Sequence, residues 1–116
     1  MDRLRRRVDF VAAARGPKAP GTAFTVQCRD RGDGGPARVG FTVSRKVGTA
    51  TERNRVRRRL RAVVTRLGPD AMRQSNDYVL IGRRAALSRE FQLLLDDLRQ
   101  ALKRLDRKAA PSPTTD

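Results

Sequence analysis

The residues best suited to chemistry in this sequence form a dense run of arginines near its centre. Six of the nine residues from 53 to 61 are arginine, and none is acidic: Arg53-Asn54-Arg55-Val56-Arg57-Arg58-Arg59-Leu60-Arg61. A guanidinium can grip a phosphate through two parallel hydrogen bonds and can stack on a base, whereas a lysine supplies a point charge. Like charges one turn apart destabilise an isolated helix. The run therefore predicts binding to a polyanion, in preference to a merely solvated helix face.

A second cationic group precedes this run, where a predicted strand leads into a turn. Ser44 can donate a hydrogen bond to a phosphate, Arg45 and Lys46 add charge, and Gly48 allows a sharp turn or a close backbone approach. The group is consistent with a loop that binds phosphate, although a glycine at such a turn also has an ordinary structural explanation.

Residues for acid–base or metal chemistry are scarce. The chain has no histidine and one cysteine, Cys28, which excludes an internal disulfide and the usual zinc ligand sets. Carboxylates are scattered singly, and the adjacent pair Asp96-Asp97 falls in an amphipathic stretch where a solvated helix face is expected. We therefore predict no catalytic residue and no metal ligand in the protein. Cys28 is expected to be a small apolar residue on a strand.

The charge balance indicates the same kind of partner. The 116 residues include 27 Lys and Arg against 12 Asp and Glu, a formal net charge of +15. A compact body with this self-repulsion is expected to meet an anionic partner, and the length favours a single domain. The sequence has no apolar run long enough to span a bilayer, and residues 1–7 lack the apolar stretch of a secretory signal, so we expect a cytoplasmic protein. The arginine helix could lie on a membrane surface, but its apolar stripe lacks aromatic anchors.

The clearest predicted element is a helix from Thr51 to Leu67, which Gly68-Pro69 ends. Its apolar stripe consists of Val56, Leu60, Val63, Val64 and Leu67. At about 100° per residue, the arginines point in almost every direction outside this stripe. The helix is therefore expected to bury one face and present cations on the rest.

Two segments before this helix alternate apolar and polar residues with the period of a half-buried strand, Thr22–Cys28 and Arg38–Ser44. Their connection, Arg29–Ala37, is rich in glycine, which favours an antiparallel pair. The sheet face away from the core is expected to be small and polar. A further short strand is compatible with the segment before the central helix.

The remaining elements complete an α+β pattern. Residues 3–15 predict a short helix, 74–77 a loop and 78–81 a strand, and Ser88 is a natural N-cap for a last helix. That helix has one apolar face, made of Phe91, Leu94, Leu95, Leu98, Leu102 and Leu105. Residues 1–106 are expected to form the domain and 107–116 a disordered tail. The order is helix, strand, strand, helix, strand, helix, which indicates helices packed on one small sheet.

Two motifs in order resemble the signature of the bacterial ribonuclease P protein component. They are Val43-Ser44-Arg45-Lys46-Val47-Gly48-Thr49-Ala50 and the arginine run from 53 to 61. The resemblance extends more faintly to Asp9-Phe10, Arg38-Val39-Gly40, residues 77–81 and the last helix, so it covers residues 3–106. The motifs are specific because both their order and their spacing match.

The resemblance implies an αβββαβα two-layer sandwich with a left-handed βαβ crossover, similar to a domain of ribosomal proteins. It also implies a monomeric protein subunit that binds a catalytic RNA and assists removal of the 5′ leader from precursor tRNA, with Mg²⁺ held mainly by the RNA. The implied RNA contacts are Ser44, Arg45, Lys46, Arg53, Asn54, Arg55, Arg57, Arg58 and Arg61. The implied leader-binding cleft is lined by Phe10, Thr25, Gln27 and Thr42.

The chain departs from the family pattern at three positions. Ala14 and Gln27 stand where family members often carry aromatics, and Thr49 stands where asparagine is common. With Phe10 alone, we expect the cleft to hold the leader mostly through backbone charge. Two alternatives remain open from the residues: a structural protein of another ribonucleoprotein such as the ribosome, and a DNA-binding module.

Overall fold

The computed structural model describes residues 2–109, with side chains described up to residue 107. Its strands and helices follow the order β1 (Asp2–Arg3), α1 (Arg7–Ala14), β2 (Lys18–Ala19), β3 (Phe24–Asp30), β4 (Arg38–Thr42), α2 (Ala50–Leu67), β5 (Asn76–Gly82) and α3 (Phe91–Ala109). Short 3-10 turns lie at Arg45–Val47, Pro69–Ala71 and Arg84–Leu87. The expected α+β class and αβββαβα order are confirmed. The additional strand is β1, which precedes α1, and β2 is the short strand that the pattern left open.

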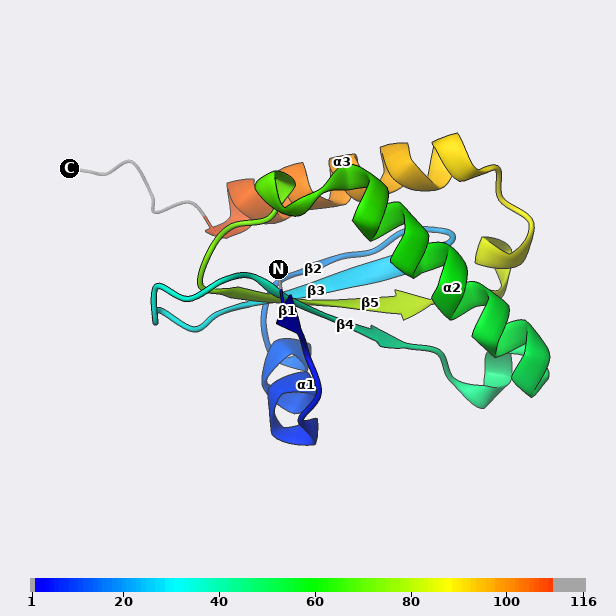
Figure 1. The fold of residues 1–116 in the computed structure, drawn as a ribbon, viewed down its shortest axis with the longest axis horizontal. Helices are drawn as coiled ribbons and strands as arrows, with labels where there is room; N and C mark the ends of the chain where they lie inside the picture. The colour runs from blue at the N-terminus through cyan, green and yellow to red at the C-terminus, as the bar shows by residue number, and fades with distance from the viewer. Residues whose placement is uncertain (1, 110–116) are drawn as a thin grey trace.

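The strands form one mixed sheet in the order β1-β4-β5-β3-β2. Figure 1 shows α2 and α3 on one face of this sheet and α1 on the other. The main sandwich therefore consists of the sheet and the α2–α3 layer, and α1 adds a partial third layer. Strands β4 and β5 are parallel and α2 connects them. The left-handed sense of this crossover stays a prediction of the resemblance.

The expected direct pairing of the two alternating strands is wrong. β3 and β4 do run in opposite directions, but β5 lies between them, antiparallel to β3 and parallel to β4. The central position suits β5 because four of its residues, Tyr78 to Ile81, are apolar and face both sides of the sheet. A local pattern of alternation shows that a strand has a buried face, but it does not specify the neighbouring strand.

The expected loop at 74–77 is also partly wrong, because Asn76 and Asp77 begin β5. Asp77 is fully buried and accepts hydrogen bonds from the guanidinium groups of Arg31 and Arg38, with Arg38 Nε at 2.7 Å. A buried carboxylate is tolerated where such partners satisfy it. Both arginines lie far from Asp77 in the sequence. The local pattern therefore assigned this polar residue to the loop before the strand.

The main core lies between the sheet and the two covering helices. The alternation predicted for β3 is confirmed, because Phe24, Val26 and Cys28 enter this core. From α2 come Val56, Leu60, Val63 and Val64, and from α3 Leu94, Leu95, Leu98, Leu102 and Leu105. Phe91 does not join them, since 37% of its surface is exposed.

The last helix begins later than expected and continues further. Ser88 lies before the helix, whereas Glu90 Oε1 accepts a hydrogen bond from Gln92 N at 3.2 Å and takes the capping position. Helix α3 continues to Ala109, three residues beyond the expected domain boundary. The rest of the predicted tail, 110–116, lies outside the described residues.

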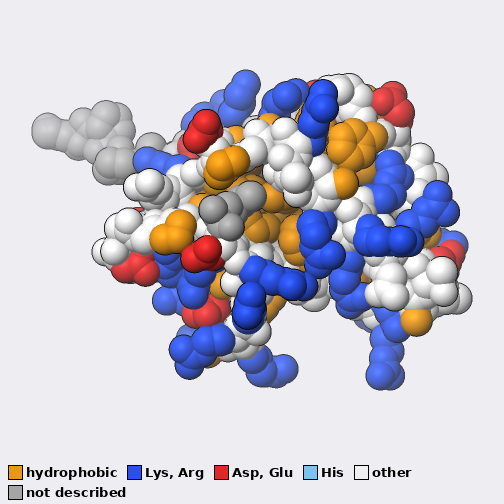
Figure 2. All heavy atoms as spheres, in the orientation of Figure 1, with side chains coloured by type: hydrophobic (Ala, Val, Ile, Leu, Met, Phe, Trp, Pro, Cys, Tyr) orange, Lys and Arg blue, Asp and Glu red, His pale blue; other side chains and the backbone are white. Residues whose placement is uncertain are grey.

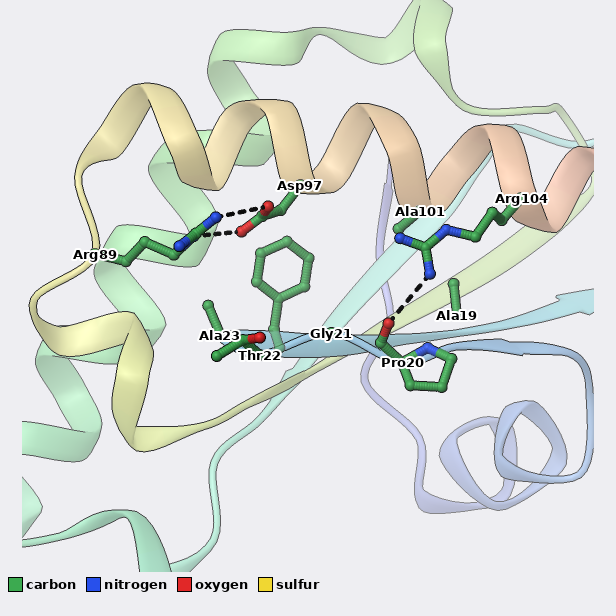
Figure 3. A pocket seen from close by; sticks show the side chains of 10 residues that line it. Ala19, Pro20, Gly21, Thr22, Ala23, Arg89, Asp97, Ala101 and Arg104 are labelled. Atoms are coloured by element: carbon green, nitrogen blue, oxygen red, sulfur yellow. Dashed lines mark hydrogen bonds and ion pairs between the residues drawn. The ribbon is translucent and has the colours of Figure 1, made fainter.

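Two polar contacts of α3 lie at a hollow beside β2 (Figure 3), one to the segment that precedes α3 and one to the segment that follows β2. Arg89 forms a two-point ion pair with Asp97, with Nε to Oδ2 at 2.7 Å, and Arg104 donates to the Pro20 carbonyl. Asp96 instead accepts from Arg99 and Gln92. The only adjacent acidic pair singled out from the sequence is therefore held in separate surface contacts.

Candidate nucleic-acid interface

A capping box sets the start of α2. Glu52 N donates to Thr49 Oγ1 at 3.2 Å, and Glu52 Oε1 accepts from Thr49 N at 2.9 Å. This arrangement satisfies two backbone donors at the helix end. The helix therefore begins at Ala50, and Thr49, which departs from the family pattern, is its N-cap.

The acid in this box is neutralised by an arginine that sequence reasoning did not select. Arg84 Nη2 lies 3.1 Å from Glu52 Oε2, and this hydrogen bond is the main reason that the pKa of Glu52 lies below its ordinary value. Arg84 Nη1 also donates to the Val47 carbonyl at 2.8 Å. Arg84 thus stabilises the turn before α2 and neutralises Glu52, the carboxylate beside the arginine run. The signal in the sequence was the Arg83-Arg84 pair directly after β5.

The turn itself brings Ser44, Arg45 and Lys46 to the surface next to the helix. Gly48 has φ 155°, and a Cβ there would lie 2.3 Å from Glu52 Oε1. A side chain at this position would therefore disrupt both the turn and the capping box. The glycine is explained by these local contacts.

The arginines of the run divide into three groups by their contacts. Arg55 and Arg58 are exposed, and neither has a partner within residues 2–107. In the second group, each arginine has a contact with a neighbouring group of the protein. Arg53 donates to the Gly48 carbonyl at 3.2 Å, and Arg57 donates to Asn54 Oδ1 at 3.1 Å. Arg61 places its guanidinium carbon 5.5 Å from the centre of the Phe41 ring.

Arg59 forms the third group, because its donors are used inside the protein. It donates to the carbonyl oxygens of Ala86, Leu87 and Arg89, at 3.2 Å and 3.0 Å for the first two. Arg59 therefore joins α2 to the segment between β5 and α3. It was not among the predicted RNA contacts, and the helical wheel alone could not separate it from its neighbours.

The predicted RNA contacts lie together on the surface. Ser44 to Lys46 lie on the turn leading into α2, and the selected residues from Arg53 to Arg61 lie on the outer sides of the helix. Figure 2 shows Lys and Arg side chains gathered over α2 and the turns at its N-terminal end. A cationic surface of this kind raises the local concentration of a polyanion.

The predicted leader cleft falls on the sheet face that α1 partly covers. Thr42 of β4 and Thr25 of β3 both pair with Ile81 of β5, so they form one row across the sheet. Gln27 lies in the next row, opposite Val79. Thr42 is exposed, whereas Thr25 and Gln27 are each only 7% exposed. The side chains that β3 and β4 contribute here are small or polar as expected, but Val79 and Ile81 of β5 add apolar groups to the same face, and much of it is covered.

Phe10 lies at this face as part of a small second core with Leu4, Ala13, Val79 and Ile81. It is half-buried, and its ring lies directly on β4, where a Cβ at Gly40 would be 2.6 Å from Phe10 Cζ. The structure therefore places Phe10 both in a core and at the rim of the predicted cleft.

One end of the same face is anchored by charge. Asp77 pairs with Arg29 and Arg38 in the sheet register, and Asp9 of α1 forms ion pairs with the same two arginines, each at 3.4 Å. Burial raises the pKa of Asp77, but its hydrogen bonds to Arg38 and Arg31 outweigh that effect, so the net shift is downward. This network fixes α1 at one end of the sheet.

Arg83 lies near the other end and was not predicted. It is exposed, and its Nη2 lies 3.4 Å from Thr25 Oγ1. It adds a cation to a face on which sequence reasoning found only Phe10 and polar side chains.

Within residues 2–107, no group of three or more His, Cys, Asp or Glu side chains is arranged to hold a metal ion. Burial raises the pKa of the Cys28 thiol to about 11, which keeps it protonated at neutral pH. None of the described helices has the length and apolarity needed to cross a membrane.

These features define a class: a small basic α+β protein that carries an arginine-rich helix and a cationic turn on its surface. Phosphate is the natural ligand of such exposed guanidinium groups. Arg84 pairs with Glu52, the acid beside these cations.

Comparison with known proteins identifies the family. The family model described as Ribonuclease P matches residues 1–106. The ribonuclease P protein component of Ruegeria pomeroyi is 49% identical over 113 residues, covering 95% of this chain and 88% of the relative. That of Caulobacter vibrioides is 46% identical, covering 87% and 68%. The chain therefore belongs to the family of bacterial ribonuclease P protein components, the protein subunits of an endoribonuclease made of RNA and protein.

Solved structures agree with this assignment. The RNase P protein from Thermotoga maritima has a TM-score of 0.71 at 29% identity, covering 92% of this chain and 97% of that one. The Staphylococcus aureus RNase P protein has a TM-score of 0.73 at 23% identity, covering 90% and 94%, and supports the fold. The family assignment favours the ribonucleoprotein subunit over the ribosomal and DNA-binding alternatives.

Proposed function

We propose that the arginine surface of α2, together with the Ser44–Lys46 turn, binds the catalytic RNA of ribonuclease P. The observation that carries this proposal is the contrast between neighbouring arginines. Arg59 is used by protein carbonyls, whereas the donors of Arg55 and Arg58 have no partner within the described residues. Phosphates of a folded RNA are the chemical partner that satisfies such groups.

The sheet face beside α1 holds the single-stranded 5′ leader of precursor tRNA in this proposal. Phe10 offers one ring, Thr42 and the partly covered Thr25 and Gln27 offer polar groups, and Arg83 adds charge. Each base stacked on an aromatic is worth about 1–3 kcal/mol, so one ring supports a modest stacking contribution. The leader is therefore held mainly through its phosphates.

Hydrolysis of the phosphodiester uses Mg²⁺ held by the RNA rather than by this chain. The described residues do not fit a magnesium site near the arginine surface, because Glu52, the acid at the start of α2, is committed to Arg84 and Thr49. The contribution of the protein is to neutralise phosphates and to position the RNA strands. The protein acts in the cytoplasm, as one monomer in each complex.

Reconstitution tests this proposal directly. Catalytic RNA and precursor tRNA are combined with or without the purified protein at low and at high Mg²⁺, and release of the leader is measured. Stimulation that is largest at low Mg²⁺ is expected, because protein cations then replace ions that the RNA–RNA complex otherwise needs. Protein without RNA is expected to cleave nothing. Absence of stimulation, or robust cleavage by the protein alone, would contradict the proposal.

A further inference from the structure

We propose that the leader continues from the α1 face around the outer edge of β4 and onto α2, through a groove that binds single-stranded RNA. The inference rests on the proposed function and assigns a new contact to it. The path would place Phe41 and Arg61 against the leader, whereas the family resemblance assigned Arg61 to the catalytic RNA and gave Phe41 no role.

The groove consists of two hollows that share Arg57 and Arg61. The first lies between Leu4 and Phe10 on one side and these two arginines on the other, with Gly40 and Phe41 at its base. The second continues along α2, past Asn54 and Arg58. We call the pair the edge groove. It connects the sheet face that α1 covers with the outer surface of α2. These two surfaces otherwise lie on opposite sides of the sheet.

The edge groove exists because β1 is short. β1 pairs with β4 only at Arg38 and Val39, so within residues 2–109 no strand covers the outer edge of β4 beyond Val39, the edge that faces away from β5. Gly40 then lets the Phe10 ring rest on the strand, because a side chain there would overlap it. The two phenylalanines thus lie at the same edge, Phe10 with the α1 core and Phe41 against the α2 core.

The lining of the edge groove matches a single-stranded polynucleotide. Its residues include Arg3, Arg57, Arg58 and Arg61, and neither hollow is lined by Asp or Glu. Phe41 is half-buried, packs against the main core and faces the Arg61 guanidinium. A base can stack on this ring or on the guanidinium plane while leader phosphates meet Arg3 and Arg57, and Arg58 stays with the catalytic RNA. In a duplex the faces of the bases are covered by stacking, so the occupant is a single strand.

Leader length provides the test. Holoenzyme is reconstituted with wild-type protein or with Phe41→Leu, which keeps an apolar contact with the core and removes the ring. Binding is measured for mature tRNA and for precursors whose leaders increase from one nucleotide upward. We expect Phe41→Leu to weaken binding about 5- to 10-fold for long leaders only, as loss of one stacked base implies. Phe91→Leu, at an exposed site on α3, is the matched control and should change nothing.

An equal effect at every leader length, or no effect at any length, would overturn the edge groove. Arg61→Lys provides a second arm, because it keeps the charge and removes the planar group that can stack. It should lower affinity for long leaders without altering the thermal midpoint of the protein. Binding of the catalytic RNA alone is measured in parallel. Normal binding of that RNA together with leader-independent effects would reject the groove and leave the proposed function standing.

Discussion

At the residue scale, arginines that are adjacent in the sequence differ in what their guanidinium groups contact. Arg58 is exposed to solvent. Arg59, the next residue, donates hydrogen bonds to backbone carbonyls in the segment between β5 and α3. Net charge counts both equally, but only a guanidinium with free donors can grip a phosphate without breaking an internal contact. The number of basic residues therefore overstates the number available to RNA.

Replacing Arg55 and Arg58 together by Ala should weaken binding to the catalytic RNA and reduce its salt dependence. Each phosphate contact contributes a slope of about 0.7 to 0.9 in log–log form, so two lost contacts should reduce the slope by about 1.4 to 1.8. The measurement is the dissociation constant across a range of salt concentrations. Lys103→Ala with Arg107→Ala, exposed on α3, removes the same charge and is the control. An equal change in both double variants would indicate a general charge effect.

Asp77 is the other decisive residue, and Asp77→Asn should lower the free energy of unfolding by about 3 kcal/mol. The reason is that Arg31 and Arg38 lose a buried charged partner. The pKa of Asp77 in the fold lies below its ordinary value. Its stabilisation is therefore complete above the unfolded pKa of about 3.9 and is lost as the pH falls through the lower folded pKa. Denaturant unfolding at neutral pH and across the acid range below pH 4 measures both effects.

The variant should show a flatter dependence on pH in the acid range than the wild type. Asp96→Asn is the control, since that carboxylate is 45% exposed and should contribute little. A variant as stable as the wild type at neutral pH would show that the network is not what holds β5 in place.

At the element scale, α2 is positioned by contacts at its start and along one flank. The Thr49–Glu52 capping box begins it, and Arg59 ties its middle to the turn that precedes α3. The exposed arginines therefore project from a helix whose rotation and position are set by its neighbours. A binding surface of this kind loses little conformational freedom when RNA docks.

Arg59→Ala should destabilise the protein without removing a phosphate contact. Three backbone carbonyls lose a charged donor, and we expect a cost of about 2 kcal/mol in unfolding free energy. The salt slope for RNA binding should stay close to that of the wild type. Arg58→Ala is the reciprocal control, with a changed slope and a stability change of about 0.5 kcal/mol or less. A reduced slope for Arg59→Ala would place this side chain on the RNA.

At the scale of the whole molecule, a net charge of +15 opposes compaction, and multivalent anions should relieve the repulsion. Sulfate should raise the midpoint of thermal unfolding more than chloride at equal ionic strength, because it binds the native arginine surface. A binding contribution of 1 kcal/mol corresponds to a rise of about 4 °C for a domain of this size. The Arg55→Ala and Arg58→Ala double variant should lose most of the difference between the salts. An undiminished difference would place the anions elsewhere.

The sequence was sufficient for the features that depend on local periodicity and composition. The stripe from Val56 to Val64 predicts the buried face of α2, and the alternation of Phe24, Val26 and Cys28 predicts that of β3. Such patterns work because a helix or a strand repeats its facing direction at a fixed interval. Charge and the ordered motifs were likewise enough to indicate a polyanion and the family.

Only the tertiary structure decided which distant residues become partners. It inserted β5 between β3 and β4, buried Asp77 against Arg38, and turned Arg59 inward while leaving Arg58 outside. It also opened the edge of β4 beside Phe41. These outcomes depend on contacts between segments far apart in the chain, and the free energy of each contact depends on burial and geometry that no local pattern encodes.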